Sequence, residues 1–393
     1  MADKYNRRSL LAQIFLVSLK LGLTSFGGPV AHLGYFHNEY VQKRKWVDER
    51  TYSDLVALCQ FLPGPASSQV GMGIGIMRGG IIGGLISFAG FTLPSAVALT
   101  VFALFINEFH FAGSGWLHGL KIVAVVVVLQ AVLGMGKNLA SERATASIAV
   151  ASASAVLLWQ TNLTQILVII IAGIAGLMFL KRNAGPVPVK IAVPIKQKSG
   201  LLALGLFLAI FLILPFAGKT GNMIEITLFD SFYRSGALVF GGGHVVLPLL
   251  ERELVPEGLI SEEAFLAGYG AAQAVPGPLF TFASYLGMVI GGWKGAIIAT
   301  AGIFLPGFLL IMAALPFWGM LRQKGSVQRA LAGVNASVVG ILLAALYDPI
   351  FTSTVRSPAD FAFGAVLFGL IHFWKLPPWL IALLGASGGL LLF

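Results

Sequence analysis

A helix-breaking phrase occurs twice in this sequence, each time inside a strongly apolar stretch. The first copy runs from Gln60 to Pro65 (QFLPGP) and the second from Gln273 to Pro278 (QAVPGP). A proline has no backbone N–H to donate, clashes with the preceding helical turn, and pushes the residue before it out of helical geometry. Two prolines that flank a glycine therefore predict a break in any helix that contains them.

The composition places these breaks in a lipid bilayer. Of the 393 residues, 57% are hydrophobic and 11% are charged, whereas a soluble domain carries about 25% charged residues. We therefore predict an all-α polytopic membrane protein with about 10–13 transmembrane or broken helices. The excess of 26 basic over 16 acidic residues is typical of cytoplasmic loops in such a protein and does not indicate nucleic-acid binding.

A broken helix at membrane depth leaves backbone groups unpaired, which is tolerated only inside protein or beside a water-filled cavity. A helix that restarts after the second proline of each phrase points its free N–H groups and its positive dipole end toward that cavity. Such an end favours an anion, and many transporters build their binding site from broken helices in two repeated halves. We therefore expect the two breaks to face each other across an anion site near the bilayer midplane.

Apolar segments of about 20 residues, the length that crosses the hydrocarbon core, predict the individual spans. They lie approximately at residues 10–35, 55–76, 80–106, 119–137, 145–160, 163–181, 200–217, 224–250, 265–286, 290–315, 330–347, 360–374 and 377–393. The segments at 55–76 and 265–286 contain the two breaks, so broken helices or re-entrant hairpins are expected there.

The two phrases belong to a longer internal repeat. Phe26-Gly27-Gly28 matches Phe240-Gly241-Gly242 at an offset of 214, the two breaks match at 213, and Gly79-Gly80 matches Gly291-Gly292 at 212. The ordered series indicates a duplication. We expect a first repeat over residues 1–180, a basic linker plus one extra helix over 181–223, and a second repeat over 224–393.

The extra helix predicts that the two repeats have opposite orientations. Each half has six spans, and one extra span lies between them. The second half is therefore inverted, and a pseudo-two-fold axis in the membrane plane relates it to the first. The basic linker between Lys181 and Lys198 is expected in the cytoplasm. The loops at 36–54 and 251–263 have charges opposite to those this count requires.

Two cations lie within apolar segments at equivalent positions of the repeats. Lys20 precedes the first Phe-Gly-Gly motif and Arg234 precedes the second. A charge within a membrane span is expensive and is usually functional or paired, so we interpret both as anion ligands. The alternative is a side chain that reaches the headgroups from near a helix end. Asp230 lies one helical turn before Arg234 and could neutralise it, so we expect Lys20 to matter more.

Other polar and small residues flank the breaks. The glycines of the Phe-Gly-Gly motifs permit either unwound backbone or close helix packing. The glutamine that opens each phrase needs a partner, which is either a carbonyl freed by the break or the ligand. Ser67 and Ser68 follow the first break, whereas Leu279 and Phe280 follow the second. The main ligand contacts are therefore expected at the first break.

The remaining reactive residue types give no pattern of an enzyme. We interpret His32, His37 and His244 as surface or loop histidines and the single cysteine, Cys59, as a packing residue. One cysteine excludes an intrachain disulfide and a cysteine-rich metal site. The sequence has no phosphate-binding loop and no nucleophile paired with a base. We therefore expect no metal, no cofactor and no enzymatic activity.

These motifs together resemble the chromate transporter family, in particular its long-chain, two-domain members. The resemblance rests on Ser25 to Pro29, Lys45 to Glu49, both Pro-Gly-Pro phrases, Gly79 to Pro94, and Phe240 to His244. It implies a secondary active transporter that exports chromate across the bacterial inner membrane, driven by the membrane potential or a proton gradient, and so gives chromate resistance. The implied partners are chromate or a similar oxyanion and the lipid bilayer, and a homodimer is left open.

Two other functions stay open. One is a transporter or channel for another tetrahedral oxyanion such as sulfate. The other is a membrane-embedded reductase, which needs a redox cofactor or reactive thiols that one cysteine does not supply. The candidate substrate-binding residues are Lys20, Ser25, Gly27, Gly28, Gln60, Pro63, Gly64, Pro65, Ser67, Ser68, Arg234, Gly241, Gly242, Gln273, Pro276, Gly277 and Pro278.

Overall fold

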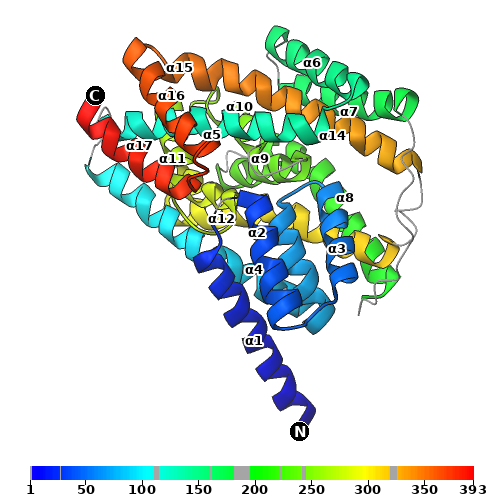
Figure 1. The fold of residues 1–393 in the computed structure, drawn as a ribbon. Coiled ribbons are helices and arrows are strands. Elements are labelled where there is room, and N and C mark those ends of the chain that lie inside the picture. The colour runs from blue at the N-terminus through cyan, green and yellow to red at the C-terminus, as the bar shows by residue number, and fades with distance from the viewer. Residues whose placement is uncertain are drawn as a thin grey trace. The chain divides into compact units, whose positions relative to one another are not determined.

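The computed structural model describes residues 2–26, 28–109, 115–159, 162–180, 195–220, 224–240, 245–318 and 325–393, and these ranges are helical with no strand (Figure 1). The predicted all-α class is confirmed. The elements are α1 (Ala2–Thr24), α2 (Gly28–Phe36), η1 (His37–Lys43), α3 (Glu49–Phe61), α4 (Ala66–Phe109), α5 (Gly115–Leu139), α6 (Arg143–Leu158), α7 (Asn162–Phe179), α8 (Gln197–Thr220), α9 (Ile224–Leu238), α10 (Val246–Leu254), α11 (Glu262–Ala272), η3 (Leu279–Thr281), α12 (Phe282–Ala314), η4 (Leu315–Phe317), α14 (Gly325–Ala345), η5 (Leu346–Phe351), α15 (Thr352–Thr354), α16 (Pro358–His372) and α17 (Pro378–Leu392).

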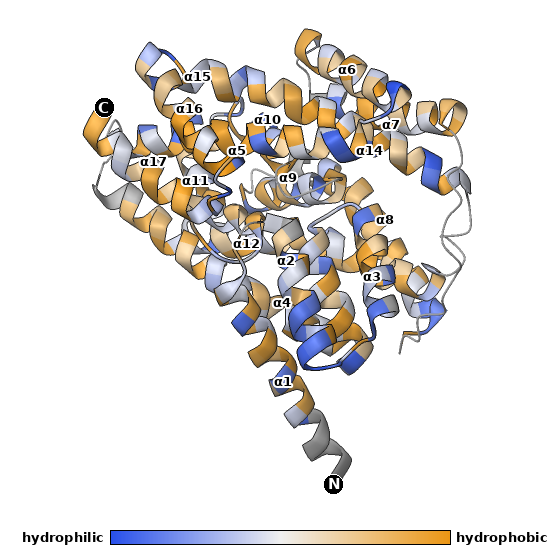
Figure 2. Ribbon diagram, viewed as in Figure 1, coloured by the Kyte–Doolittle hydropathy of each residue, from blue (hydrophilic) through white to orange (hydrophobic). Residues whose placement is uncertain are grey.

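The helices have the surface of a multi-pass membrane protein. Five helical segments of the described chain are long and apolar enough to cross a bilayer: Ala66–Phe105, Gly115–Leu139, Gln197–Phe216, Leu279–Phe317 and Gly325–Thr354. Large apolar side chains are exposed along them, and on α8 the residues Leu202 and Phe216 are 75% and 74% exposed. Figure 2 shows hydrophobic residues along much of the helices. Such a surface is stable only against lipid or another apolar surface.

The two longest helices are hairpins, not single rods. In α4, Gly80 has φ 66° and ψ −161°, and beyond it the chain folds back, since Ser87 Oγ donates to the Gly71 carbonyl at 2.8 Å. In α12, Gly292 has φ 61°. The first arm of α4, residues 66–79, is shorter than the about 20 residues that a crossing needs, as expected for one arm of a re-entrant hairpin.

Glycine is required where the two arms of α4 touch. A Cβ on Gly75 would collide with the Gly83 carbonyl and would lie 2.8 Å from Ser87 Cβ. Because backbone cannot move aside, we expect Gly75→Leu to lower the free energy of unfolding by about 2–3 kcal/mol. Denaturation in detergent measures this. Gly134→Leu is the control, since a Cβ there meets no atom within 4 Å; equal stability of the two variants would contradict the hairpin.

Four breaks interrupt the helices at the motifs. The predicted breaks at the Pro-Gly-Pro triplets are confirmed, because α3 ends at Phe61 before α4 starts at Ala66, and α11 ends at Ala272 before η3 starts at Leu279. The continuous spans predicted at 10–35 and 224–250 are wrong. Each is divided at its Phe-Gly-Gly motif, where glycine tolerates backbone such as the φ of 77° at Gly28. Gly27, Gly241 and Gly242 lie outside the described residues.

The chain forms two compact units, and each contains parts of both repeats. The first unit consists of Met1–Leu104, Val187–Gly243 and Val275–Leu321, and the second of Phe105–Pro186, His244–Ala274 and Arg322–Phe393. The proposed division at 1–180, 181–223 and 224–393 therefore describes the sequence repeats and not these units.

The two repeats interlock within the second unit. Helix α14 of the second repeat packs on α6 and α7 of the first (Figure 1), and α5 of the first repeat packs on α16 and α17 of the second. Small residues allow this close approach: Gly333 faces the Ala172 carbonyl, and Gly119 faces Gly385. Each repeat thus completes its core with helices of the other.

Candidate functional site

Two reciprocal backbone hydrogen bonds join the repeats in the first unit. The Gly64 N–H of the first Pro-Gly-Pro break donates to the Val239 carbonyl at 2.7 Å, and the Gly277 N–H of the second break donates to the Ser25 carbonyl at 2.9 Å. Val239 and Ser25 directly precede the two Phe-Gly-Gly motifs. Each Pro-Gly-Pro break is therefore closed by the Phe-Gly-Gly break of the other repeat.

The two Pro-Gly-Pro triplets have the same geometry. Gly64 has φ 116° and Gly277 has φ 104°, a region that only glycine adopts without strain. In each triplet the glycine and the second proline are buried, and the first proline, Pro63 or Pro276, is half-buried. The triplets therefore act as equivalent parts of a two-fold arrangement inside one unit.

Side chains one turn downstream satisfy the carbonyl groups that the breaks free. At the first break, Gln69 Nε2 donates to the Pro63 carbonyl at 3.0 Å and to the Gly307 carbonyl at 3.2 Å. At the second break, Thr281 Oγ1 donates to the Pro278 carbonyl at 2.7 Å. Gln69 and Thr281 are not among the residues predicted from the sequence, although their position just after a proline is a signal for this role.

The first turn of α4 supplies unused backbone donors. The first intrahelical acceptor is the Pro65 carbonyl, which receives the Gln69 N–H at 2.9 Å. The N–H groups of Ala66, Ser67 and Ser68 precede that bond and have no preceding helical turn to accept them. The expected helix N-terminus after the first break is thus present.

His32 belongs to this region, and its interpretation as a surface or loop histidine was wrong. It lies in α2, is 1% exposed, and its Nδ1 is 3.3 Å from Ser67 Oγ. Its ring packs edge-on against Phe91 at 5.5 Å between centroids and lies beside the Ser25 backbone. The break at the Phe-Gly-Gly motif turns α2 inward, which a continuous helix would not do.

Three buried polar atoms in this region have no protein partner in the described part of the chain. They are Ser25 Oγ, Ser68 Oγ and His32 Nε2, and Ser25 and Ser68 are 0% and 2% exposed. A buried polar group without a partner costs about 1–3 kcal/mol. Ser68 lies in the first turn of α4, and His32 contacts that turn through Ser67, so these unpaired groups need an explanation.

Both predicted cations are in ion pairs. Lys20 Nζ lies 2.7 Å from Glu39 Oε2, and Arg44 Nε lies 2.8 Å from Glu39 Oε1. Burial alone would raise the pKa of the Glu39 carboxyl, but the bonds and charges of Lys20 and Arg44 outweigh it and lower this pKa. Arg234 lies 3.0 Å from Asp230, which confirms the expected neutralisation.

The Arg234–Asp230 ion pair is expected to contribute to the free energy of unfolding. The Asp230 side chain is 9% exposed and that of Arg234 is 29% exposed. Arg234→Ala leaves a buried carboxylate without this partner, so we expect a loss of about 1–3 kcal/mol of unfolding free energy, less than for a fully buried pair. The double variant Asp230→Asn/Arg234→Gln should recover most of it in detergent denaturation. A double variant as unstable as Arg234→Ala would show that the pair is not the reason.

The two candidate glutamines differ in their surroundings. Gln60 is exposed, whereas Gln273 is buried, lies beside Tyr269, and belongs to the second unit. Their equal position in the repeats therefore does not give them equal environments.

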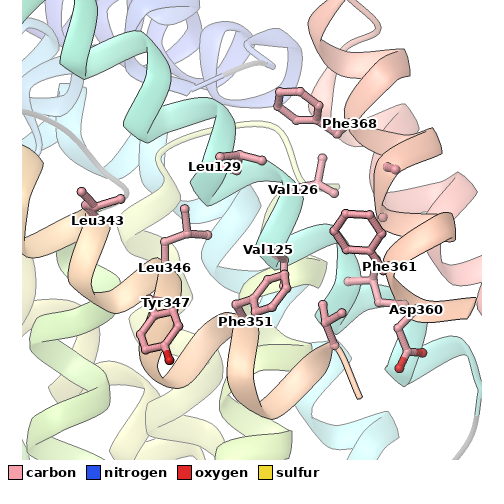
Figure 3. Close-up of a pocket in the computed structure, with 14 residues that line it drawn as sticks. Val125, Val126, Leu129, Leu343, Leu346, Tyr347, Phe351, Asp360, Phe361 and Phe368 are labelled. Atoms are coloured by element: carbon pink, nitrogen blue, oxygen red, sulfur yellow. The ribbon is translucent and has the colours of Figure 1, made fainter. Parts of the chain in front are cut away.

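The second unit contains an apolar cavity of about 470 Å³ between α5, α14 and α16 (Figure 3). Its labelled lining includes Val126, Phe361 and Phe368, and its carboxylate, Asp360, already accepts a hydrogen bond from His118 at 2.7 Å. An apolar wall and a carboxylate do not suit an anion. The described residues also contain no group of His, Cys, Asp and Glu that could hold a metal ion.

A sequence model of the chromate transporter family matches residues 12–177 and, a second time, residues 226–390. The chain belongs to the chromate transporter family. It is 26% identical to a chromate transport protein of Pseudomonas aeruginosa over 380 residues, which cover 92% of this chain and 87% of that protein. It is 27% identical to a probable chromate transport protein of Synechococcus elongatus over 391 residues, or 97% and 95% of the two chains. No solved structure matches it.

A shorter relative supports the internal duplication. An uncharacterized transporter of Bacillus subtilis is 31% identical over 123 residues, which cover 69% of that protein but 31% of this chain. That relative is therefore less than half as long as this chain. A relative about the size of one repeat therefore exists as a separate chain.

Proposed function

We propose that this protein is a secondary active transporter that exports chromate across the bacterial inner membrane and so confers chromate resistance. The observation that carries the proposal is the family match in both repeats. Relatives named as a chromate transport protein and a probable chromate transport protein, which align over most of the chain, support it. We propose transport without any enzymatic step.

The membrane potential supplies enough free energy for export. Moving one charge across the membrane is worth about 2.3 kcal/mol per 100 mV. Chromate carries two negative charges, so an inside-negative potential favours its outward movement by about twice that amount. The proposal therefore needs neither ATP nor a phosphate-binding loop.

The proposed binding region consists of the four breaks and the polar residues next to them. A dianion that leaves water requires several donors, because its burial without them is far too costly. The first turn of α4 and the Ser67 and Ser68 hydroxyls are suitable donors. Lys20 and Arg234 contribute in this proposal only when their ion pairs with Glu39 and Asp230 open.

The reciprocal bonds between the repeats suit a carrier. Each repeat holds the other at a break, through Gly64 and Val239 on one side and Gly277 and Ser25 on the other. A movement of one repeat against the other must therefore alter both breaks together. In this proposal that linked movement exposes the site to one side of the membrane at a time.

The direct test is chromate uptake into inverted membrane vesicles, which correspond to export from the cell. We expect saturable accumulation that an uncoupler abolishes, and that is absent from vesicles without the protein. Excess sulfate serves as a competitor, because both ions are tetrahedral dianions.

Each result separates one alternative. Uptake of sulfate with no uptake of chromate would replace the proposed substrate. Uptake that rises linearly with concentration, without saturation, would indicate a channel. No uptake of either ion in the presence of an imposed potential would refute the proposed transport.

A further inference from the structure

Buried groups connect the first break to the second. The contacts run from Gly277 N–H to the Ser25 carbonyl, from the Ser25 backbone to the His32 ring, and from His32 Nδ1 to Ser67 Oγ. All four residues lie in the first unit. The second Pro-Gly-Pro break thus touches the helix end that follows the first.

We propose that Ser25 Oγ, Ser68 Oγ and His32 Nε2 bind the tetrahedral oxyanion at the N-terminal turn of α4, in a site made of neutral hydrogen-bond donors and present once per chain. This inference rests on the proposed transport function and specifies its binding site. The cations Lys20 and Arg234 are not part of it.

The three atoms form a ligand site because the protein leaves each of them unused. Each is buried and lacks a partner among the residues that the structure describes. Ser87, in contrast, is 2% exposed and bonds both Ser18 Oγ at 3.0 Å and the Gly71 carbonyl at 2.8 Å. Ser87 shows that protein groups of the same unit can satisfy a buried serine hydroxyl. The free hydroxyls mark a position where an outside oxygen completes the bonding.

The donors suit an oxyanion. When Ser67 donates its hydroxyl hydrogen to His32 Nδ1, the ring hydrogen is on Nε2, which becomes a donor. Two serine hydroxyls and the backbone N–H groups of the first α4 turn add to it. Hydrogen bonds to an ionised group are stronger than those between neutral groups. These donors can therefore bond the four oxygens of the anion without a buried counter-charge.

The second repeat does not have the same set of free hydrogen-bond donors at the equivalent positions. At the offsets of the repeat, Ser25 corresponds to Val239, His32 to Val246 and Ser67 to Phe280. Ser68 corresponds to Thr281, whose hydroxyl already donates to the Pro278 carbonyl at 2.7 Å. Because the counterparts are apolar or satisfied, the inference gives one site, in the first repeat, although the backbone breaks are duplicated.

The test measures affinity and stability together in the purified full-length protein. Equilibrium binding of potassium chromate and of sodium sulfate is measured for the wild type, Ser25→Ala, Ser68→Ala and His32→Phe. We expect each serine variant to bind roughly 10- to 100-fold more weakly, since each loses a hydrogen bond to a charged group. The melting temperature without ligand should stay unchanged or rise, because the alanine removes an unpaired buried hydroxyl.

Ser87→Ala is the matched control. It removes an equally buried but bonded hydroxyl, so it should lower the melting temperature and leave the affinity at the wild-type value. If Ser25 and Ser68 have a merely structural role, their alanine variants will also have a lower melting temperature and the wild-type affinity. This result would overturn the inference.

The outcomes separate the site from the proposed function. Chromate binding by the wild type with unchanged affinity in Ser25→Ala and Ser68→Ala overturns the site and leaves the transport proposal standing. Sulfate binding that requires Ser68, with no chromate binding, supports the site and overturns the proposed substrate. A wild type that binds neither ion overturns both.

Discussion

Replacing Gly64 by alanine is expected to lower chromate transport by roughly 100-fold, while the protein still reaches the membrane. Gly64 has φ 116°, and a non-glycine residue held there costs about 1–3 kcal/mol of strain. Its Cβ would also lie 3.1 Å from Gly307 Cα and 3.2 Å from Gln69 Nε2.

The variant fails because the break cannot relax without losing its bonds. Movement of Gly64 separates its N–H from the Val239 carbonyl and disturbs Gln69, which holds the Pro63 carbonyl. Each such bond is worth about 0.5–1.5 kcal/mol, and each 1.4 kcal/mol corresponds to a factor of ten. Strain and lost bonds together give the expected loss.

Gly80→Ala is the control for backbone strain alone. Gly80 also has a positive φ, 66°, but a Cβ there meets no atom within 4 Å. We expect transport within about threefold of the wild type, since a local strain of about 1–3 kcal/mol is added but no bond of the closed break is disturbed. Vesicle uptake at matched protein levels measures both variants. Equal uptake by Gly64→Ala and Gly80→Ala would show that the closed break has no part in transport.

The double substitution Pro63→Ala/Pro65→Ala is the second change with a large expected effect. Alanine is the best helix former, so α3 and α4 can join into one helix. In that helix the Gly64 N–H bonds the Gln60 carbonyl four residues earlier and no longer reaches Val239. We expect transport to fall by roughly tenfold or more, because one reciprocal bond between the repeats is lost.

Pro215→Ala is the control for removing a proline from a helix. Pro215 lies inside α8, the extra helix between the repeats, where the chain stays helical across it. Alanine at this position should leave transport unchanged. Surface labelling and detergent denaturation verify that the double variant inserts and folds. Wild-type uptake by a well-expressed Pro63→Ala/Pro65→Ala protein would contradict the role of the break.

The breaks could be predicted from the sequence because their causes are local. Two prolines around a glycine exclude a regular helix whatever surrounds them. The Phe-Gly-Gly breaks could not be assigned in the same way. Glycine is compatible both with unwound backbone and with closely packed helices, and only the tertiary fold decides which of the two occurs after Thr24 and after Leu238.

The contacts of the site depended on tertiary structure. Lys20 was recognised as unusual, but its bond to Glu39 requires η1 to fold back beside α1. His32 was misassigned because one histidine in a short apolar run gives no sign of burial. Its meeting with Ser67 joins segments that are 35 residues apart. The packing of α5 and of α14 on helices of the other repeat likewise has no local sequence signal.

Chromium anomalous diffraction from crystals grown with chromate tests most directly whether the first break binds the oxyanion. We predict a chromium peak at the N-terminal turn of α4, with oxygens within hydrogen-bond reach of Ser68 Oγ, Ser25 Oγ and His32 Nε2. The same peak should be absent from crystals of Ser68→Ala grown at the same chromate concentration. Chromium bound only elsewhere, such as beside Lys20 or Arg44, with these three atoms still without a partner, would contradict the site.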